Sequence, residues 1–336
     1  MSNVRTPRDA RWSCTRCGAC CRSFTLGPVE PAVIDALTEA DIAARWPPAA
    51  EAPWHLDGYL THRDGACVFL MDDSRCFLHV TLGAASKPGF CRQFPFELVR
   101  DPSGIVATAR PDCAGFSRSH VTGAPLSEGL SDLAGVAVSV PRFAPETVVI
   151  LPGHEVSLSD WMDLEADLLA DLYARDTEPA GLIAATRRSL GIEGEGDPAR
   201  ARLAMRAVLA ALSSALAQAP DDAFTRQMRS FAAKASAMEL PEPLSAPGQA
   251  YLNLLLRSHI QGKAFVPYGS VAAGLGLFVL NARIARLVDP TDPGAALSAW
   301  VRFSLNRTLH PLLSRAAPAL VDIFRFASDS GLPADQ

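Results

Sequence analysis

All eight cysteines of this 336-residue chain lie in about its first third. Half of them fall in one short run, Cys14-Thr-Arg-Cys17-Gly-Ala-Cys20-Cys21. A C-x-x-C turn lets two thiolates reach one metal ion, and a glycine such as Gly18 relieves crowding where the chain wraps it. So dense a run is not expected of unrelated thiols that merely fill a core. The sequence therefore predicts a metal site, with these candidate ligands: Cys14, Cys17, Cys20, Cys21, Cys67, Cys76, Cys91 and Cys113.

The ligand count leaves the metal open between zinc and an iron–sulfur cluster. A structural zinc takes four ligands, and a single cluster normally does too. Eight cysteines therefore allow two sites, one polynuclear site, or one site with spare thiols. Cys20 and Cys21 are adjacent, so their side chains should diverge and serve different metals, or one is not a ligand. This favours an iron–sulfur cluster, or more than one metal, over a single zinc. A thiol redox sensor that uses the C-x-x-C pairs as reversible disulfides is a further hypothesis.

Composition and charge limit the partners and the cellular compartment that we expect for this chain. The chain has 31 basic and 36 acidic residues, a formal net charge of -5, which argues against a nucleic-acid partner. The N-terminal stretch Met1–Trp12 lacks the apolar segment of a secretory signal, so we expect a cytoplasmic protein with reduced thiols. No charged residue lies between Lys263 and Arg283, but Pro267 and three glycines interrupt the stretch. We therefore expect a buried core helix there and no membrane span.

Cysteine usage and turn residues also divide the chain. The stretch 117–139 is rich in Gly, Ser and Pro, which predicts a boundary near residue 120. Residues 1–120 would form the cysteine-cluster metal-binding module and residues 121–336 a helical domain. The expected fold is mainly α, a small irregular cysteine-rich α+β N-terminal module followed by an all-α helical domain. The apolar residues of the module are too few for a tight core, so a metal would help to hold it together.

Local patterns place the elements. In the module they predict a strand at Arg22–Leu26, a helix from Val33 to Ile42 ended by Pro47-Pro48, a hairpin of Cys67–Leu70 with Cys76–Val80, and a second turn between Phe94–Val99 and Ile105–Ala107. In the helical domain they predict helices at Trp161–Leu172 after a Ser159 cap, Leu182–Leu190, Pro198–Leu216, Asp221–Met238, Gln249–Ile260, Ser270–Leu287, Ala295–Leu305 and Pro318–Phe326. These helices would bind a protein partner or cover the metal site.

The cysteine pattern resembles a known family. The opening run, followed by Cys67-Val-Phe-Leu, Cys76 and Cys91-Arg-Gln-Phe-Pro, is similar to the CxxCxxCC cysteine-cluster family over about residues 12–116. Zinc or iron chelation is ascribed to that family, whose members typically carry eight cysteines. The resemblance thus implies a metal-chelating module.

A second resemblance supplies the alternative function. The stretch Cys76-Phe-Leu-His-Val-Thr-Leu-Gly, with Gln249-Ala-Tyr-Leu-Asn-Leu-Leu-Leu further on, looks like the flagellin lysine N-methylases. That implies a protein lysine N-methyltransferase using S-adenosylmethionine. Phe94-Pro95-Phe96 departs from the Pro-Arg usual in those enzymes, and we find no glycine-rich strand–turn–helix loop. Whether the chain is an enzyme stays open, and we assign no catalytic or cofactor-binding residue.

Other polar residues near the cysteines have ordinary explanations. His55, His62 and His79 are weaker ligand candidates than the thiols. Four arginines flank cysteines and could offset the negative charge of thiolates bound to a metal: Arg16, Arg22, Arg75 and Arg92.

Overall fold

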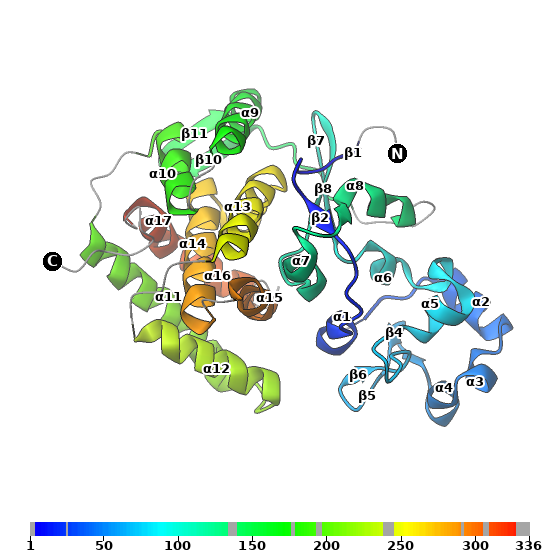
Figure 1. Ribbon diagram of the computed structural model, residues 1–336. Helices are drawn as coiled ribbons and strands as arrows, with labels where there is room; N and C mark the ends of the chain where they lie inside the picture. Colours follow the sequence, from blue (N-terminus) through cyan, green and yellow to red (C-terminus); the bar gives the residue numbers. More distant parts are fainter. Residues whose placement is uncertain are drawn as a thin grey trace. The chain divides into compact units, whose positions relative to one another are not determined.

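The computed structural model describes residues 4–24, 26–133, 140–175, 179–192, 197–237, 245–289, 292–304 and 309–326. The chain forms two compact units (Figure 1). Unit 1 comprises residues 1–100 and 104–141, and unit 2 comprises residues 101–103 and 142–336. The mainly α fold, with strands concentrated in the N-terminal region, confirms the predicted fold class. The module end near residue 120 stays a prediction, since the unit that holds the thiols continues to Pro141.

The main sheet of unit 1 has three strands in the order β1-β8-β7. Strands β7 (Phe96–Asp101) and β8 (Gly104–Ala109) form the second predicted hairpin, and β1 (Val4–Arg5) pairs in parallel with β8. The Asp101 carboxylate accepts hydrogen bonds from the Ser103 amide and hydroxyl at 2.9 and 2.8 Å, which closes the turn.

Two tiny hairpins follow one another immediately before the middle cysteines. They are β3 (His55–Leu56) with β4 (Tyr59–Leu60), and β5 (His62–Arg63) with β6 (Ala66–Cys67). Each turn is an Asp-Gly pair in which both residues have positive φ, as a type I′ turn requires: Asp57 (50°), Gly58 (80°), Asp64 (51°) and Gly65 (76°). The second hairpin fixes the register of Cys67, which lies opposite His62.

Two predicted strands of unit 1 are wrong. The stretch predicted as a strand at Arg22–Leu26 begins inside helix α1 (Ala19–Ser23). The predicted hairpin of Cys67–Leu70 with Cys76–Val80 is reduced to one bridge between Leu70 and Cys76, after which α5 (Phe77–Leu82) is helical. Short apolar runs do not distinguish a strand from a buried helix, and here Phe77 and Leu78 are both buried within a helix.

The predicted helix at Val33–Ile42 is divided into short helices. Helix α2 covers Pro31–Glu39 and α3 covers Ile42–Arg45. Pro47 begins helix α4 (Pro47–Glu51) instead of ending the helical region, because proline is well tolerated at a first helical position. The other elements of unit 1 are β2 (Arg11–Trp12), η1 (Ala84–Ser86), α6 (Gly89–Gln93), α7 (Ala114–Ser119), β9 (Ala124–Pro125), α8 (Leu126–Gly129) and η2 (Leu130–Leu133).

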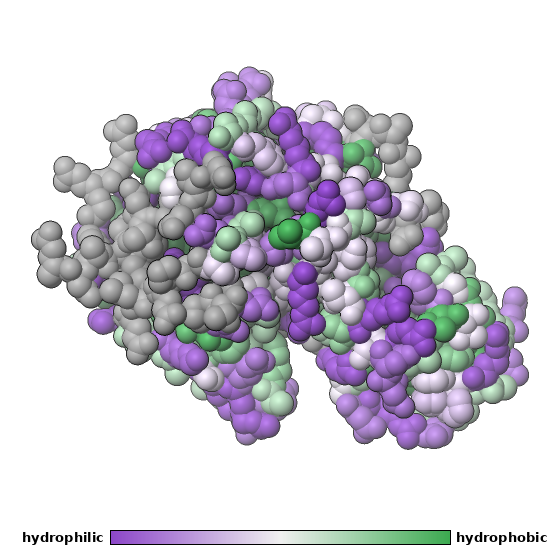
Figure 2. Space-filling model, in the orientation of Figure 1, coloured by the Kyte–Doolittle hydropathy of each residue, from purple (hydrophilic) through white to green (hydrophobic). Residues whose placement is uncertain are grey.

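Strongly hydrophobic residues are scattered on the face of unit 1 that Figure 2 shows, among hydrophilic and weakly apolar ones. Leu56 and Tyr59, at the tip of the first small hairpin, are 65% and 43% exposed. Single exposed apolar residues of this kind are normal on a protein surface.

Unit 2 opens with a hairpin that the all-α prediction for residues 121–336 lacked, β10 (Thr147–Leu151) with β11 (His154–Ser157). Each helix predicted for this part is present, although α9 is capped by Ser157 and not by Ser159. The predicted helix ends at Met238 and Leu305 lie outside the described residues. The elements after the hairpin are α9 (Leu158–Ala174), α10 (Pro179–Ser189), α11 (Pro198–Gln218), α12 (Ala223–Ser236), α13 (Ala246–Gln261), η3 (Val266–Tyr268), α14 (Val271–Val288), α15 (Pro293–Ser304), α16 (His310–Arg315) and α17 (Ala317–Phe326).

Helix α14 forms the core of unit 2 and packs against α17, α15 and α12 (Figure 1). A side chain at Gly276 would overlap the carbonyl of Leu320, so this glycine permits the close crossing of α14 with α17. In the described ranges, α14 is the one helix long and apolar enough to cross a membrane, and 83% of it is buried inside the fold. The absence of a membrane span stays a prediction.

Unit 2 also buries a cluster of charges. The Lys263 ammonium, 1% exposed, lies 3.2 Å from an Asp101 carboxylate oxygen and 2.7 Å from Glu165. It also donates to the Gln261 carbonyl at 3.1 Å. Removing the Lys263 ammonium would leave two buried carboxylates without the cation that they share, which is strongly destabilising.

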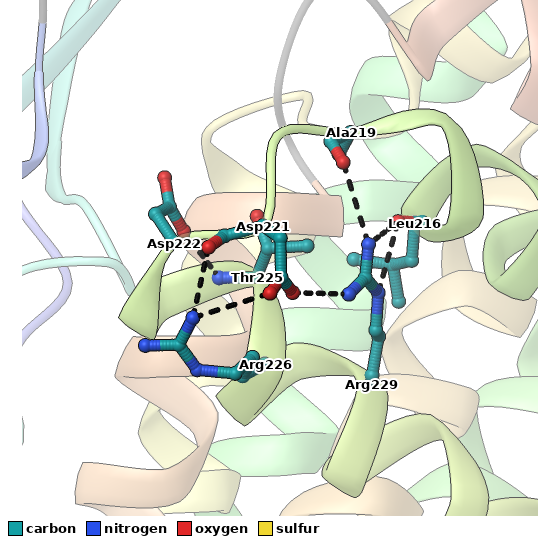
Figure 3. Close-up of polar contacts among 7 residues, drawn as sticks. All are labelled: Leu216, Ala219, Asp221, Asp222, Thr225, Arg226 and Arg229. Carbon is teal, nitrogen blue, oxygen red and sulfur yellow. Dashed lines mark hydrogen bonds and ion pairs between the residues drawn. The ribbon is translucent and has the colours of Figure 1, made fainter.

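The joint between α11 and α12 is held by arginines (Figure 3). The Arg229 guanidinium donates to the Leu216 carbonyl at 3.0 and 3.2 Å and to the Ala219 carbonyl at 3.3 Å, so it adds charged donors at the end of α11. It also pairs with Asp221 at 2.6 Å. Arg226 reaches the Asp221 carbonyl at 2.8 Å.

We expect Arg229→Ala to lower the free energy of unfolding by about 1 kcal/mol, because a half-exposed charged donor to several acceptors contributes on that scale. Urea unfolding followed by circular dichroism would measure it. Arg226→Ala is the control: its side chain is 59% exposed, against 37% for Arg229, and we expect a smaller loss. Equal losses in the two variants would contradict the special role of Arg229.

Candidate metal centre

Five thiols lie in one region of unit 1, where Cys67 is buried and the other four are half-buried. Cys67 ends β6, Cys76 precedes α5, Cys91 lies in α6, and Cys20 and Cys21 lie in α1. Cys67 belongs to one apolar core cluster, and Cys21, Cys76 and Cys91 pack against that cluster. The Cys20 sulfur lies 3.9 Å from the Cys21 sulfur. Four separate segments thus deliver these inner thiols, as we call Cys20, Cys21, Cys67, Cys76 and Cys91, to one region.

A left-handed turn starts the segment that carries Cys20 and Cys21. Gly18 has φ 65° and precedes α1. A β-carbon at Gly18 would collide with the Arg22 guanidinium and would lie 3.3 Å from Leu70. Glycine is therefore needed here for its left-handed backbone conformation, whereas the flexible Arg22 side chain could move aside.

A compact loop brings Cys76 back toward Cys67. The Leu70 amide donates to the Cys67 carbonyl at 2.8 Å, and the Phe77 amide donates to Phe69 at 2.8 Å. Within the loop, the Asp73 carboxylate accepts from the Arg75 amide at 3.0 Å. Local hydrogen bonds therefore set the spacing between these two thiols.

Glu30 anchors the segment of Cys91 from a distant part of the sequence. Its carboxylate accepts from the Gly89 amide at 2.9 and 3.2 Å, at the start of α6. The contact satisfies an open helix amide and spans 59 residues of sequence. Sequence reasoning missed Glu30, since no local pattern signals so distant a contact.

Burial disfavours ionisation of most inner thiols. Burial raises the pKa of Cys67 to about 12, with smaller contributions from Cys76 and Cys20, against a hydrogen bond from the Phe69 backbone. Burial also raises the pKa of Cys91 well above its ordinary value, although the Lys87 ammonium opposes this. The desolvated interior holds these sulfurs as neutral thiols unless a positive charge is supplied.

The adjacent pair Cys20 and Cys21 shares its protons. The hydrogen bond with Cys21 lowers the pKa of Cys20 to about 6 against the cost of burial, and Lys87 helps. The same hydrogen bond is the largest cause of a raised pKa at Cys21, and burial is the second. The two thiols titrate as a unit that carries one negative charge more readily than two.

The cation beside the inner thiols differs from those expected. Sequence analysis singled out Arg16, Arg22, Arg75 and Arg92, but Lys87 is the cation that lowers the pKa of both Cys20 and Cys91. Arg75 pairs with Asp73 at 2.6 Å, which satisfies its charge locally. Lys87 lies four residues before Cys91 in the sequence.

Three predicted ligands stand outside this group. Cys113 is buried beside Trp12 at the start of α7. Burial raises its pKa to about 12, opposed chiefly by backbone amides of α7, and Cys20 contributes a small increase. Cys14 is exposed and Cys17 half-buried, and in the described part of the chain neither enters the interactions among the inner thiols. His62 and His79 are exposed.

The sulfur donors are of the kind that a thiophilic metal prefers, but the thiols lie farther apart than the ligands of one metal ion do. Thiolates are the preferred ligands of iron–sulfur clusters and common ligands of zinc. A bound cation deprotonates a coordinating thiol and thereby reverses the effect of burial. Among the described residues, no three Cys, His, Asp or Glu side chains are grouped closely enough to hold a metal ion. The thiols would therefore have to draw together around it.

One comparison with known proteins bears on this region. Residues 13–114 match the family model CxxCxxCC, described as "Putative zinc- or iron-chelating domain". No curated protein and no solved structure matches the chain significantly. The match contains all eight cysteines and ends within unit 1, which makes a role in metal binding plausible. None of the comparisons supports the methylase resemblance, which stays a prediction.

In the metal-free protein, we expect the free energy of unfolding to decrease as pH rises from 9.0, the ordinary pKa of the thiol, to about 12, its value for Cys67. The unfolded chain loses the thiol proton first, so it binds fewer protons than the folded state over this window. Urea unfolding of chelated, reduced protein at a series of pH values would measure the slope.

Cys67→Ala should lessen that slope, to which Cys91 and Cys113 also contribute, whereas Cys14→Ala, at an exposed position, should leave it unchanged. A slope unaffected by Cys67→Ala would show that burial of this thiol does not control the pH dependence.

Proposed function

We propose that the chain is a metal-binding protein whose centre, in unit 1, holds zinc or iron through the inner thiols. The observation that carries the proposal is the convergence of thiols from four segments on one apolar cluster. The family match over residues 13–114 supports the same chemistry. We extend the proposal to a cytoplasmic setting, where the eight cysteines would stay reduced and available.

Metal binding accounts for the inner thiols better than a plain core does. Valine or alanine would fill the same space without an ionisable group. A thiol interior becomes useful when a cation offsets the cost of burying thiolates. Metal binding would then supply part of the folding free energy of unit 1, whose elements are short.

Within this proposal we favour an iron–sulfur cluster over a single zinc ion. One tetrahedral ion uses four thiolates, and neighbouring side chains such as Cys20 and Cys21 reach the same ion with difficulty. A cluster presents several iron atoms, so thiolates that diverge can each reach one. A single site with four ligands would use four of the five inner thiols. The fifth thiol could then bind a second metal.

The role of unit 2 is a separate proposal. Its exposed helical surface would bind a protein partner. Lysine methyl transfer from S-adenosylmethionine remains the alternative activity predicted from sequence, and no feature of the described residues favours it.

Purification without oxygen, followed by analysis of metal and acid-labile sulfide and by absorption spectroscopy, tests the proposed function. We expect a brown protein with iron and sulfide. A colourless protein with stoichiometric zinc would retain metal binding and overturn the preference for a cluster. If the protein stays free of metal after exposure to both iron and zinc, the proposal is overturned.

Replacing one inner thiol tests the ligand set. We expect Cys91→Ser to weaken metal binding by roughly 100-fold or more and to destabilise unit 1, because binding free energy is also folding free energy here. Glu39→Gln, at an exposed position on α2 of the same unit, is the control and should bind normally. Unchanged metal content and melting in Cys91→Ser would remove Cys91 from the ligand set.

A further inference from the structure

The C-x-x-C pair Cys14 and Cys17 has no place among the inner thiols, and its position suggests a distinct task. Both belong to the segment that leads into α1. Along this segment, Cys14 is exposed, Cys17, Cys20 and Cys21 are half-buried, and Cys21 packs against the apolar core. Thiols therefore line the chain from solvent to the inner group.

Cys67 is the one buried member of the inner thiols, the other four being half-buried, and an ion needs a route of access to it. Cys67 is 6% exposed and belongs to the same apolar cluster as Phe69 and Leu78, which are each 1% exposed. A hydrated cation does not cross such surroundings as a free ion, because it would lose its water without gaining ligands. Loading requires ligands that replace water at the surface before the ion moves inward.

The segment of Cys14 and Cys17 is held at its ends and lightly bonded between them. The Ser13 amide donates to the Ser119 hydroxyl at 2.8 Å, and α1 begins at Ala19. Among the described residues, the stretch Cys14–Cys17 makes one hydrogen bond, from Arg22 to the Cys17 carbonyl at 3.4 Å. Arg16, at φ 53°, and Gly18, at φ 65°, turn the chain on either side of Cys17. Few bonds would therefore break if these thiols swung toward α1.

We propose that Cys14 and Cys17 form a loading site, which takes a thiophilic divalent cation from solution and hands it to Cys20 and the other inner thiols. The proposal rests on the proposed binding of zinc or iron by the inner thiols, not on the preference for a cluster, and it adds an order of events to that binding. Each thiol that binds releases one proton, and each thiolate that lets go takes one back. The transfer is ligand exchange, with no change in oxidation state.

The kinetics of loading test the proposal. The probe is Co²⁺, whose thiolate complexes absorb strongly, added without oxygen to the metal-free full-length chain. With Cys14 and Cys17 both replaced by serine, we expect the loading rate to fall roughly tenfold or more. The amount of Co²⁺ bound at completion should match the wild type. Thr15→Ala, at the exposed position between the two cysteines, is the matched control and should load at the wild-type rate.

Two results would overturn the loading site. A double variant that loads at the wild-type rate would show that the pair is not on the route. A double variant that ends with less Co²⁺ would show that the pair is permanently coordinated. Failure of the proposed function looks different, since the wild type itself would then bind no Co²⁺.

Alkylation of the wild type gives a readout that does not depend on a variant. Iodoacetamide added at successive times after Co²⁺ should find Cys14 and Cys17 protected first, and then reactive again as Cys20 and Cys67 become protected. Protection of all four together, or lasting protection of the pair, would contradict a handover.

Discussion

Burial of several thiols in one small apolar interior is the constraint on which unit 1 depends. As neutral thiols these side chains behave as small hydrophobes, and the core around Phe69 and Leu78 accepts them. As thiolates they repel one another and lose hydration, which the raised pKa values of Cys67 and Cys91 express. Without a metal, the same interior can be an ordinary apolar core. With a metal, its thiolates can serve as the ligands. Short elements, tight turns and the Glu30 contact to Gly89 hold the thiols near one another in either state.

Unit 2 handles buried charge in the opposite way. Its core around α14 is extensive, and the cluster around Lys263 carries its compensation within the protein, as two carboxylates and a carbonyl. Nothing external is needed to balance this ammonium. Unit 1 has Lys87 beside Cys20 and Cys91, and one cation does not balance five thiolates. The asymmetry explains why a bound cation matters to unit 1 in particular.

Sequence predicted unit 2 well because its signals are local. The caps Asp197, Asp222 and Ser270 each accept a hydrogen bond three residues into the helix they begin, and such caps are readable in the sequence. Unit 1 was harder because its elements are only a few residues long and are decided by distant contacts. The stretch Cys76–Val80 reads as a strand and folds as a helix against the core. The eight candidate ligands were predicted from the clustering of cysteines and the C-x-x-C run, and they stay a prediction, while their separation into inner thiols and others follows from tertiary packing.

The division of the chain between the units bears on how it could be dismantled. Asp101 lies at the end of β7, a strand that otherwise belongs to unit 1, yet it is one of the two acids that neutralise Lys263 in unit 2. A cut after Pro141 would leave the helical fragment with a buried lysine and one carboxylate in place of two. The halves are therefore not modules that gene fission or recombination could exchange freely. A lineage that separated them would keep the Lys263–Glu165 ion pair but would have to fill the buried place of the Asp101 carboxylate.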